Sequence, residues 1–294
     1  MNLPWTELEQ TTLKQNIHLS VKEIRNLLPN RTLSSIENRK NYLNLKSGIY
    51  KKYTLDVSFF ETYNLASAYW AGFLAADGTI RDKQKQICLV LQNRDKVHVE
   101  KFATDIQFNG PVYTRNLKRK FKPNEPEKTY MSSGLSLCGA SKLIDDLWKN
   151  YNVGPRKSLI LKPPTQITNV DIKHAFLIGY IDGDGTIGLS KDQKLELDVI
   201  GTKEIVTWAK DLIDVIVPVI TNFDGQVNKE KKNSKIFRYK VTGFRALKIL
   251  RFLNSIDVPR LARKWDKISL AREPIYKNDY LDTDIVVKRK PRNI

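Results

Sequence analysis

The sequence is poor in the residues that form disulfides or bind zinc. Its 294 residues include two cysteines, Cys88 and Cys138, and three histidines that lie far apart in the chain. Two cysteines are too few for a disulfide framework or a cysteine-based zinc site, and the histidines show no metal-ligand spacing. The sequence therefore favours neither a disulfide-rich secreted protein nor a zinc protein.

Long apolar runs are also missing. No apolar segment approaches about 18 residues, and the N-terminus does not resemble a signal peptide. We therefore expect an intracellular protein with no membrane partner, cytoplasmic or associated with the nucleoid, and of bacterial or phage rather than organellar origin.

Acidic residues are in the minority. The chain has 50 Lys and Arg against 32 Asp and Glu, so its formal charge is +18, and the basic residues are spread along the whole length. This balance favours a polyanionic partner, and nucleic acid is the leading candidate. An anionic membrane surface is the weaker alternative, because no long basic amphipathic helix stands out.

One stretch occurs twice. Residues 70–80 read WAGFLAADGTI and residues 177–187 read LIGYIDGDGTI, so both close with Asp-Gly-Thr-Ile. The two aspartates, Asp77 and Asp184, are 107 residues apart, about the length of a domain. Each copy predicts a helix that ends at a left-handed glycine and leads into a strand. A carboxylate in the last turn of a helix is disfavoured by the helix dipole, so its recurrence indicates a function rather than a solvated corner.

The segments that follow each copy also repeat. Each half predicts the order helix–strand–strand–helix–strand–strand–helix, which is a duplicated domain of the α+β class. The first half spans 66–165 and the second spans 166–294 with a basic C-terminal tail. The strands are expected near 87–91, 133–138, 195–200 and 237–242, and the helices near 95–107, 140–150, 203–213 and 246–253. Basic hairpins or loops are expected at 115–124 and 227–235.

Residues 1–48 predict a separate small unit, joined to the rest by a linker at 49–65. Three short helices are expected, and two of them begin with the spacing of a capping box, Thr6 with Glu9 and Ser20 with Glu23. A third helix begins at Thr32. Three helices with a tight last turn favour a helix-turn-helix fold, and a three-helix protein-binding module is the alternative.

The order of residues in this unit resembles the Myb/SANT-like helix-turn-helix modules. The similarity is carried by Trp5, by Ser20-Glu23-Ile24 and by Arg31-Thr32-Ile36-Arg39. The resemblance implies that the third helix enters the major groove of DNA. The residues then expected to bind DNA are Arg31, Ser34, Ser35, Asn38 and Arg39.

A second pair of residues keeps the offset of the two aspartates. Lys157 and Lys264 are also 107 residues apart, each after an arginine and near the end of its half. Either lysine alone would indicate a solvated charge, but two at this offset suggest one shared site.

Small residues in the repeated stretch predict how the aspartates meet. Ala71, Gly72 and Gly179 would allow the two helices to pack closely, which brings Asp77 and Asp184 side by side. Two adjacent carboxylates repel each other unless a cation lies between them. Hard oxygen ligands beside a nucleic acid phosphate favour Mg²⁺, and metal-assisted phosphodiester hydrolysis is the chemistry that follows.

At these residues the chain resembles the LAGLIDADG homing endonucleases of the single-chain type with two motifs, over about residues 66–272. The resemblance implies that Asp77 and Asp184 bind two or three shared Mg²⁺ ions, with main-chain oxygens of Ala76 and Gly183 sharing the coordination. Mn²⁺ would substitute, and Ca²⁺ would bind without cleavage. The catalytic residues implied besides the aspartates are Lys157, Lys264 and Gln92, the last positioning water; Gly201 stands at the counterpart of Gln92.

The family fold also implies a monomer whose two antiparallel sheets straddle the major groove of double-stranded DNA. The basic residues expected to contact DNA are Arg115, Lys118, Arg119, Lys120, Lys229, Lys231 and Lys232. The first motif departs from the family pattern, with Ala75 where the second motif has Asp182 and with Trp70 at its first position.

The sequence thus predicts a site-specific DNA endonuclease that makes a metal-dependent double-strand break at a long asymmetric target. An intron RNA maturase and a DNA-binding regulator on the same fold are the alternatives. Both aspartates and both lysines are present, which argues against a regulator with a silent site. The chain ends do not resemble intein ends, so a free-standing protein is expected.

Overall fold

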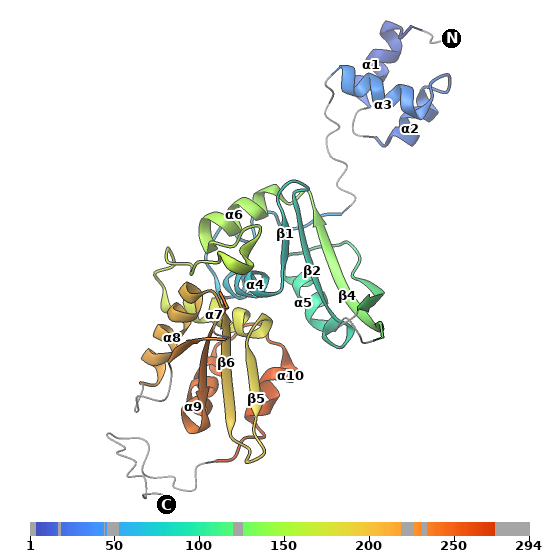
Figure 1. Cartoon of the computed structure of the whole chain (residues 1–294). Coiled ribbons are helices and arrows are strands. Elements are labelled where there is room, and N and C mark those ends of the chain that lie inside the picture. Colours follow the sequence, from blue (N-terminus) through green and yellow to red (C-terminus); the bar gives the residue numbers. More distant parts are fainter. Residues whose placement is uncertain are drawn as a thin grey trace, which may run out of the picture. The chain divides into compact units, whose positions relative to one another are not determined.

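The computed structural model describes residues 4–16, 19–43, 45, 53–119, 126–218, 226–230 and 234–273. The chain divides into two compact units, Met1–Thr54 and Leu55–Ile294, which we call the N-terminal unit and the main unit (Figure 1). Part of the predicted linker, residues 49–52, and the basic tail from 274 onward lie outside the described residues. None of the helices in the described ranges is long and apolar enough to cross a membrane.

The N-terminal unit consists of three helices around a small core. The helices are α1 (Glu7–Gln15), α2 (Val21–Leu27) and α3 (Leu33–Tyr42). The buried residues are Leu13, Ile24, Leu28 and Ile36. Both predicted capping boxes are confirmed, because Thr6 and Ser20 each accept a hydrogen bond from the backbone of the glutamate three residues later and receive its carboxylate on their own backbone N–H.

The main unit contains the predicted order of elements twice, and the α+β fold class is confirmed. The first half contains α4 (Leu65–Ala76), β1 (Thr79–Arg81), β2 (Gln86–Gln92), α5 (Lys96–Asp105), β3 (Tyr113–Arg119), β4 (Lys128–Cys138) and α6 (Ser141–Tyr151). The second contains α7 (Val170–Gly183), β5 (Thr186–Leu189), β6 (Leu195–Gly201), α8 (Lys203–Ile216), β7 (Val227–Lys229), β8 (Phe237–Thr242) and α9 (Gly243–Ser255), followed by α10 (Ala262–Trp265). Short 3-10 turns lie at η1 (Asn93–Asp95), η2 (Lys157–Leu159) and η3 (Asp266–Ile268).

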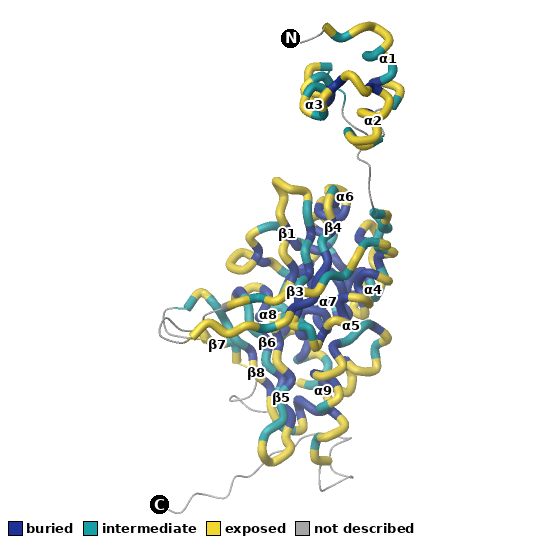
Figure 2. The backbone as a smooth tube through the Cα atoms, turned by 90° about the vertical axis from the view of Figure 1, so that its right-hand side faces the viewer, coloured by how far each residue is buried: buried dark blue, intermediate teal, exposed yellow. Residues whose placement is uncertain are grey.

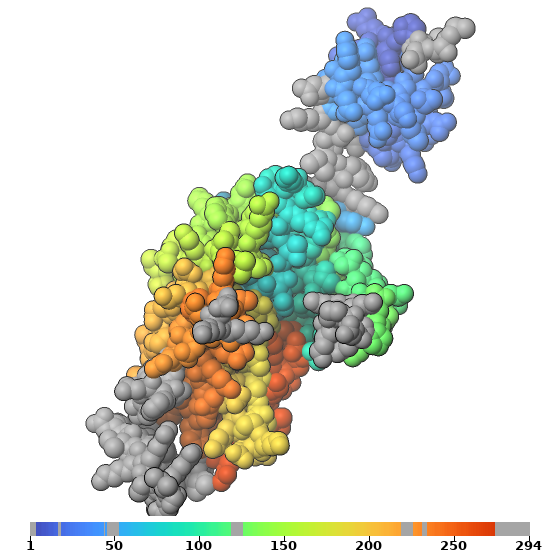
Figure 3. All heavy atoms as spheres, in the orientation of Figure 1, coloured from blue at the N-terminus to red at the C-terminus, as the bar shows by residue number. Residues whose placement is uncertain are grey.

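Each half forms one antiparallel sheet of four strands, in the orders β1-β2-β4-β3 and β5-β6-β8-β7. Burial alternates along the central strands: Ile87, Leu89 and Leu91 of β2 are buried, and the residues between them are partly exposed. The buried sides of both sheets and of α4 and α7 belong to one continuous core (Figure 2). Helix α10 lies against the first half, where Arg263 bonds to Asp95 (Figure 3).

Helices α4 and α7 pack at two glycines. A Cβ built on Gly72 would lie 2.0 Å from the carbonyl oxygen of Phe176, and one built on Gly179 would lie 1.9 Å from the carbonyl oxygen of Tyr69. No side chain fits at such distances, so both backbones approach each other only because these positions lack a Cβ. The close crossing predicted from the small residues is confirmed.

The conformation predicted for the glycines after the aspartates is wrong. Asp77 and Asp184 are the C-cap residues and are right-handed, and neither Gly78 nor Gly185 has a positive φ. These glycines are needed for space instead: a Cβ on Gly78 would lie 2.6 Å from the carbonyl oxygen of Leu74, and Gly185 is equally close to the preceding turn. After each aspartate, the backbone therefore continues in close contact with the last turn of the helix that it has just left.

The basic segments are also more regular than predicted. Residues 113–119 form β3 and residues 227–229 form β7, so the first residues of each expected loop belong to strands. Because side chains alternate along a strand, Arg115 and Lys118 lie on opposite faces of the first sheet. They cannot act as one continuous basic loop.

Candidate active site

The two helices of the crossing end beside each other. Asp77 is the first residue after α4, and Asp184 is the first residue after α7. A Cβ built on Gly183 would lie 2.2 Å from the Cβ of Ala76 and 3.3 Å from the backbone nitrogen of Asp77. The fold therefore brings together the two carboxylates that the repeat singled out.

The surroundings of the pair disfavour its negative charge. Burial and then the nearby charge of Asp77 raise the pKa of Asp184 to about 6, and Lys157 and Lys264 oppose the shift. Burial likewise raises the pKa of Asp77, against the lowering effect of the two lysines. Two partly desolvated carboxylates of like charge are the arrangement that a divalent cation relieves.

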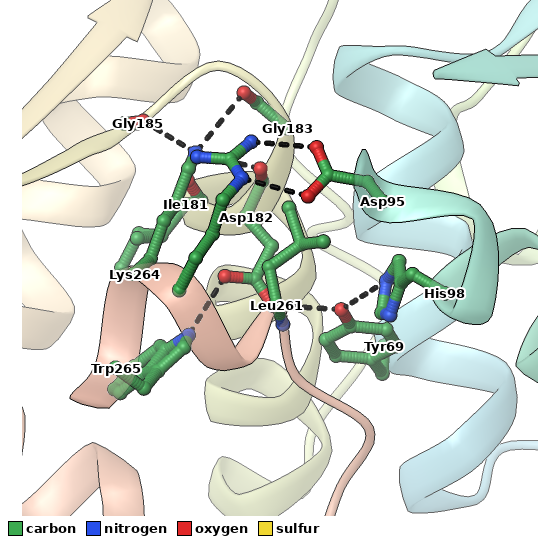
Figure 4. Close-up of polar contacts among 11 residues, drawn as sticks. Tyr69, Asp95, His98, Ile181, Asp182, Gly183, Gly185, Leu261, Lys264 and Trp265 are labelled. Atoms are coloured by element: carbon green, nitrogen blue, oxygen red, sulfur yellow. Dashed lines mark hydrogen bonds and ion pairs between the residues drawn. The ribbon is translucent and has the colours of Figure 1, made fainter. Parts of the chain in front are cut away.

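The two lysines reach the helix ends, but they make different contacts. The Nζ of Lys157, in η2, donates to the carbonyl oxygen of Ala76 at 2.9 Å. The Nζ of Lys264, in α10, donates to four carbonyls at the end of α7, those of Ile181 (2.9 Å), Asp182 (2.6 Å), Gly183 (3.3 Å) and Gly185 (2.7 Å) (Figure 4). Burial lowers the pKa of both ammonium groups, that of Lys264 to about 8.

The oxygen atoms at the helix ends fit a hard divalent cation. The carboxylates of Asp77 and Asp184 and the carbonyls of Ala76 and Gly183 are all oxygen donors, the kind that Mg²⁺ and Ca²⁺ prefer. The carbonyls accept from the lysines but keep a second lone pair. Among the described residues there is no cluster of three or more His, Cys, Asp or Glu side chains that could hold a metal ion.

A cavity of about 360 Å³ opens beside Asp184. Lys157 and Tyr180 line it, together with the small residues Ala75 and Ser158. The cavity contains one carboxylate and one ammonium group and lies at the convergence of the helix ends, so it is the space in which a phosphate could meet both charges.

Asp182, which the sequence did not predict as a site residue, is the centre of a buried hydrogen-bond network. Its Oδ2 accepts from the hydroxyl of Tyr69 at 2.7 Å and from the backbone N–H of Leu261 at 2.9 Å, and its Oδ1 accepts from Nε1 of Trp265 at 2.7 Å (Figure 4). The Tyr69 hydroxyl is also 2.8 Å from Nε2 of His98, whose pKa burial lowers to about 4. Asp182 therefore connects α4, α7 and α10 and does not reach the candidate metal site.

An ion pair next to this network also joins the two halves. Nε and Nη2 of Arg263 donate to the two carboxylate oxygens of Asp95 at 2.7 and 2.9 Å. Both groups lie close enough to Asp77 to affect its pKa, Arg263 lowering it and Asp95 raising it.

Gln92 is not brought to the cavity beside Asp184. It is exposed at the end of β2 and lines a different hollow of about 590 Å³ on the first sheet, together with Arg94 and Ser132. At its counterpart, a Cβ built on Gly201 would lie 2.3 Å from the hydroxyl of Tyr180. Glycine is therefore required there because Tyr180 occupies the space and donates to the carbonyl of Ile200 at 2.9 Å.

Arg31 was predicted to face DNA, and the structure corrects this. Its Nε and Nη2 donate to the carboxylate of Glu9 at 2.8 and 2.7 Å, its Nη2 also donates to the carbonyl of Pro4, and its guanidinium lies over the ring of Trp5. Only 8% of the residue is exposed. The charge of Arg31 is used to hold α1 against the start of α3.

The other predicted DNA-binding residues of the N-terminal unit lie on one surface. Ser34, Ser35, Asn38 and Arg39 line a shallow hollow of about 440 Å³ with Trp5, Thr32, Tyr42 and the mostly buried Arg31. The Arg39 guanidinium lies 4.9 Å from the centre of the exposed Tyr42 ring.

In the main unit, Arg115 and Lys118 are exposed on β3, Arg119 ends that strand, and Lys229 is exposed at the end of β7. Lys120, Lys231 and Lys232 lie outside the described residues.

No protein-family model and no curated protein sequence matches the chain. Solved structures with a similar fold include the homing endonuclease I-WcaI bound to its DNA recognition sequence, at 13% identity, 86% coverage of this chain, 97% of that chain and a TM-score of 0.48. Another is the LAGLIDADG homing endonuclease I-GzeII in complex with its DNA target, at 14% identity, 71% and 89% coverage and a TM-score of 0.44. A third is the N-terminal LAGLIDADG domain of DUF199/WhiA, at 14% identity, 72% and 87% coverage and a TM-score of 0.37.

Proposed function

We propose that the chain is a metal-dependent, site-specific DNA endonuclease of the LAGLIDADG type that makes a double-strand break at a long asymmetric target. The observation that carries the proposal is the convergence of Asp77 and Asp184 at the ends of two helices that cross at glycines. Burial, and for Asp184 also the charge of Asp77, raises the pKa of these carboxylates, which costs stability in the absence of a cation. A feature that is repeated at the same place in both halves despite this cost supports a catalytic role.

The residues of the site have separate parts in the proposed reaction. Divalent ions held between the carboxylates would activate water and neutralise charge on the phosphate oxygens. The ammonium group of Lys157 faces the same cavity as Asp184 and would stabilise the negative charge that develops there. Hydrolysis adds water across the ester: the water oxygen bonds to phosphorus, the P–O bond breaks, and the leaving oxygen takes up a proton.

The N-terminal unit would serve as a second DNA-binding element. Its exposed hollow presents Ser34, Asn38 and Arg39, and a tethered second binder raises affinity through effective concentration. Deleting residues 1–48 should flatten the salt dependence of binding by about one unit of log–log slope for each phosphate that the protein no longer binds. An unchanged slope would favour the protein-binding alternative for this unit.

The test of the endonuclease proposal is cleavage of DNA that the protein itself selects. Duplexes enriched by binding from a random pool, and the joined flanks of the chain's own gene, are incubated with the protein in Mg²⁺, in Mn²⁺ and in Ca²⁺. We expect breaks in Mg²⁺ and Mn²⁺ and binding without breaks in Ca²⁺. Asp184→Asn should lose cleavage by about 100-fold or more and keep binding, because the carboxylate serves the phosphate chemistry.

The matched control is Asp192→Asn, which removes an exposed carboxylate in the turn between β5 and β6. This variant should cut and bind like the unchanged protein. Enrichment of intron RNA instead of duplex DNA, with no breaks in any metal, would contradict the proposal and favour a maturase.

A further inference from the structure

The two lysines of the candidate site are not equally free. An ammonium group has three N–H donors, and those of Lys264 are taken up by four carbonyls at the end of α7. Lys157 donates to a single carbonyl, that of Ala76, so its remaining donors are open to the cavity beside Asp184. Lys264 therefore acts as a cap on a helix end, and Lys157 is available to a phosphate or a water.

The space beside the two lysines also differs. On the Lys157 side the cavity is lined by Ala75 and Ser158. The positions 107 residues later are Asp182 and Trp265, which are hydrogen-bonded to each other and buried. At these two positions the side chains are thus small on the Lys157 side, and larger, buried and bonded to each other on the Lys264 side.

The neighbouring arginines follow the same division. Arg263, which precedes Lys264, is paired with Asp95 through two hydrogen bonds. Arg156, which precedes Lys157, is exposed and forms no ion pair within the described part of the chain. The counterpart of Asp95 is Thr202, whose hydroxyl donates to the carbonyl of Leu161 at 2.6 Å. On the Lys264 side, both cationic groups are therefore hydrogen-bonded within the protein. On the Lys157 side, the ammonium group keeps donors that face the cavity, and Arg156 forms no ion pair among the described residues.

From these differences we propose that the two half-sites are catalytically unequal: the Lys157 side cleaves its DNA strand first, and nicked duplex accumulates before the second strand breaks. The inference rests on the endonuclease function proposed above and specifies its order. In each half a water oxygen bonds to phosphorus and one P–O bond breaks. The side that supplies a free ammonium and an open cavity lowers the barrier more, because charge partners aimed at the developing negative charge act mainly in the transition state.

The test follows both strands of one selected duplex, each with its own end label, under single turnover in Mg²⁺. We expect one strand to break about 10-fold faster than the other or more. Lys157→Met should slow the fast strand by about 100-fold and change the slow strand little, which removes or reverses the order. Equal rates for the two strands in the unchanged protein would overturn the inference.

Ser158→Trp provides a second variant that keeps Lys157. Ser158 is exposed at the cavity, so an indole there can reproduce the filling that Trp265 provides on the other side without disturbing the core. It should slow the fast strand selectively, and an unchanged strand order would contradict the role of the cavity.

Lys264→Met should lower the melting temperature and leave the identity of the fast strand unchanged, because Lys264 holds a helix end. A reversed strand order in this variant would overturn the inference. Absence of breaks in both strands, in Mg²⁺ and in Mn²⁺, would contradict the endonuclease proposal itself, which separates the two failures.

Discussion

The α4–α7 pair has two sides related by the 107-residue offset, which we call its flanks, and their hydrogen bonding differs. On the first flank the hydroxyl of Tyr69 contacts His98 and donates to Asp182, which also accepts from Trp265. On the second flank the equivalent positions hold Phe176, Ile205, Ala75 and Ser158. The polar positions differ as a group, because a buried carboxylate is tolerated only where every surrounding donor is present.

The positions at the helix ends show the opposite behaviour. Both halves have aspartate at the helix end (Asp77 and Asp184), lysine near the end of the half (Lys157 and Lys264) and glycine at the crossing. The residues that meet at the centre of the site are therefore the same in both halves. The residues that pack around it differ, and those that bond to one another differ together. Four measurements test whether the two halves differ in this way.

The largest effect is expected at the crossing, where the halves are equivalent. Gly72→Ala and Gly179→Ala each place a methyl group within 2.0 Å of a carbonyl oxygen of the other helix. Each should lower the free energy of unfolding by about 3 kcal/mol or more, since the helices cannot separate without opening the core. The control is Gly188→Ala, whose Cβ would lie 3.6 Å from its nearest neighbour, and chemical denaturation should show little change.

The next effect separates the flanks. Asp182→Ala leaves the donors of Tyr69, Leu261 and Trp265 without their acceptor and should cost about 2–3 kcal/mol in the free energy of unfolding. Ala75→Ser changes the equivalent position on the second flank and should cost less than about 1 kcal/mol. Similar losses for both variants in urea titrations would show that the first flank has no special weight.

The third effect is stabilising and depends on pH. The pKa of Asp184 is about 6 in the fold against a reference of 3.8, so between these values the folded state holds the extra proton. Protonation of Asp184 therefore contributes to the free energy of unfolding at low pH. This contribution is lost as the pH rises from about 4 to about 6, and it stays absent at higher pH. Without metal, Asp184→Asn should be more stable than the unchanged protein by about 1–2 kcal/mol at pH 7.5 and by much less at pH 4.

Asp192→Asn is the control for this measurement, because that carboxylate is exposed in the turn between β5 and β6. At pH 7.5 its free energy of unfolding should be close to that of the unchanged protein. A stability difference for Asp184→Asn that does not change between pH 4 and pH 7.5 would contradict the electrostatic description of the pair. Mg²⁺ should narrow the difference at pH 7.5, as a cation that binds the folded state opposes the repulsion.

The smallest effect concerns the arginines. Arg263→Gln breaks the bidentate pair with Asp95 and should cost about 1 kcal/mol, a modest figure because 40% of the Arg263 side chain is exposed. Arg156→Gln should cost close to nothing. Equal shifts in melting temperature would show that the two arginines are equivalent after all.

Much of this architecture was predictable because its causes are local. Capping boxes, alternating burial and turn residues lie within a few positions of the elements that they define, and the predicted helices and strands are present. The close crossing was predictable for a different reason, since small residues recur at one fixed offset. The same offset predicted the meeting of Asp77 and Asp184.

The errors concern partners that are distant in the chain. Arg31 has the spacing of a DNA-reading residue, but Glu9 lies 22 residues earlier and turns it inward. Asp182 bonds to Leu261 and Trp265, about 80 residues later, and no local pattern indicates this. One signal was available in the duplication itself: positions 75 and 182 differ between the halves, and so do positions 158 and 265, which is what a bonded pair would produce.

The contact between Ala76 and Gly183 has a consequence for selectivity. One helix end contributes a methyl group to this contact and the other contributes none, so the two backbones approach closely immediately before the two carboxylates. A cation bound between Asp77 and Asp184, as proposed, would then be selected by its ionic radius, because the contact between Ala76 and Gly183 limits how far the two helix ends can move toward each other. The residues in this contact would thus influence the choice of ion through their packing as well as through their carbonyl oxygens.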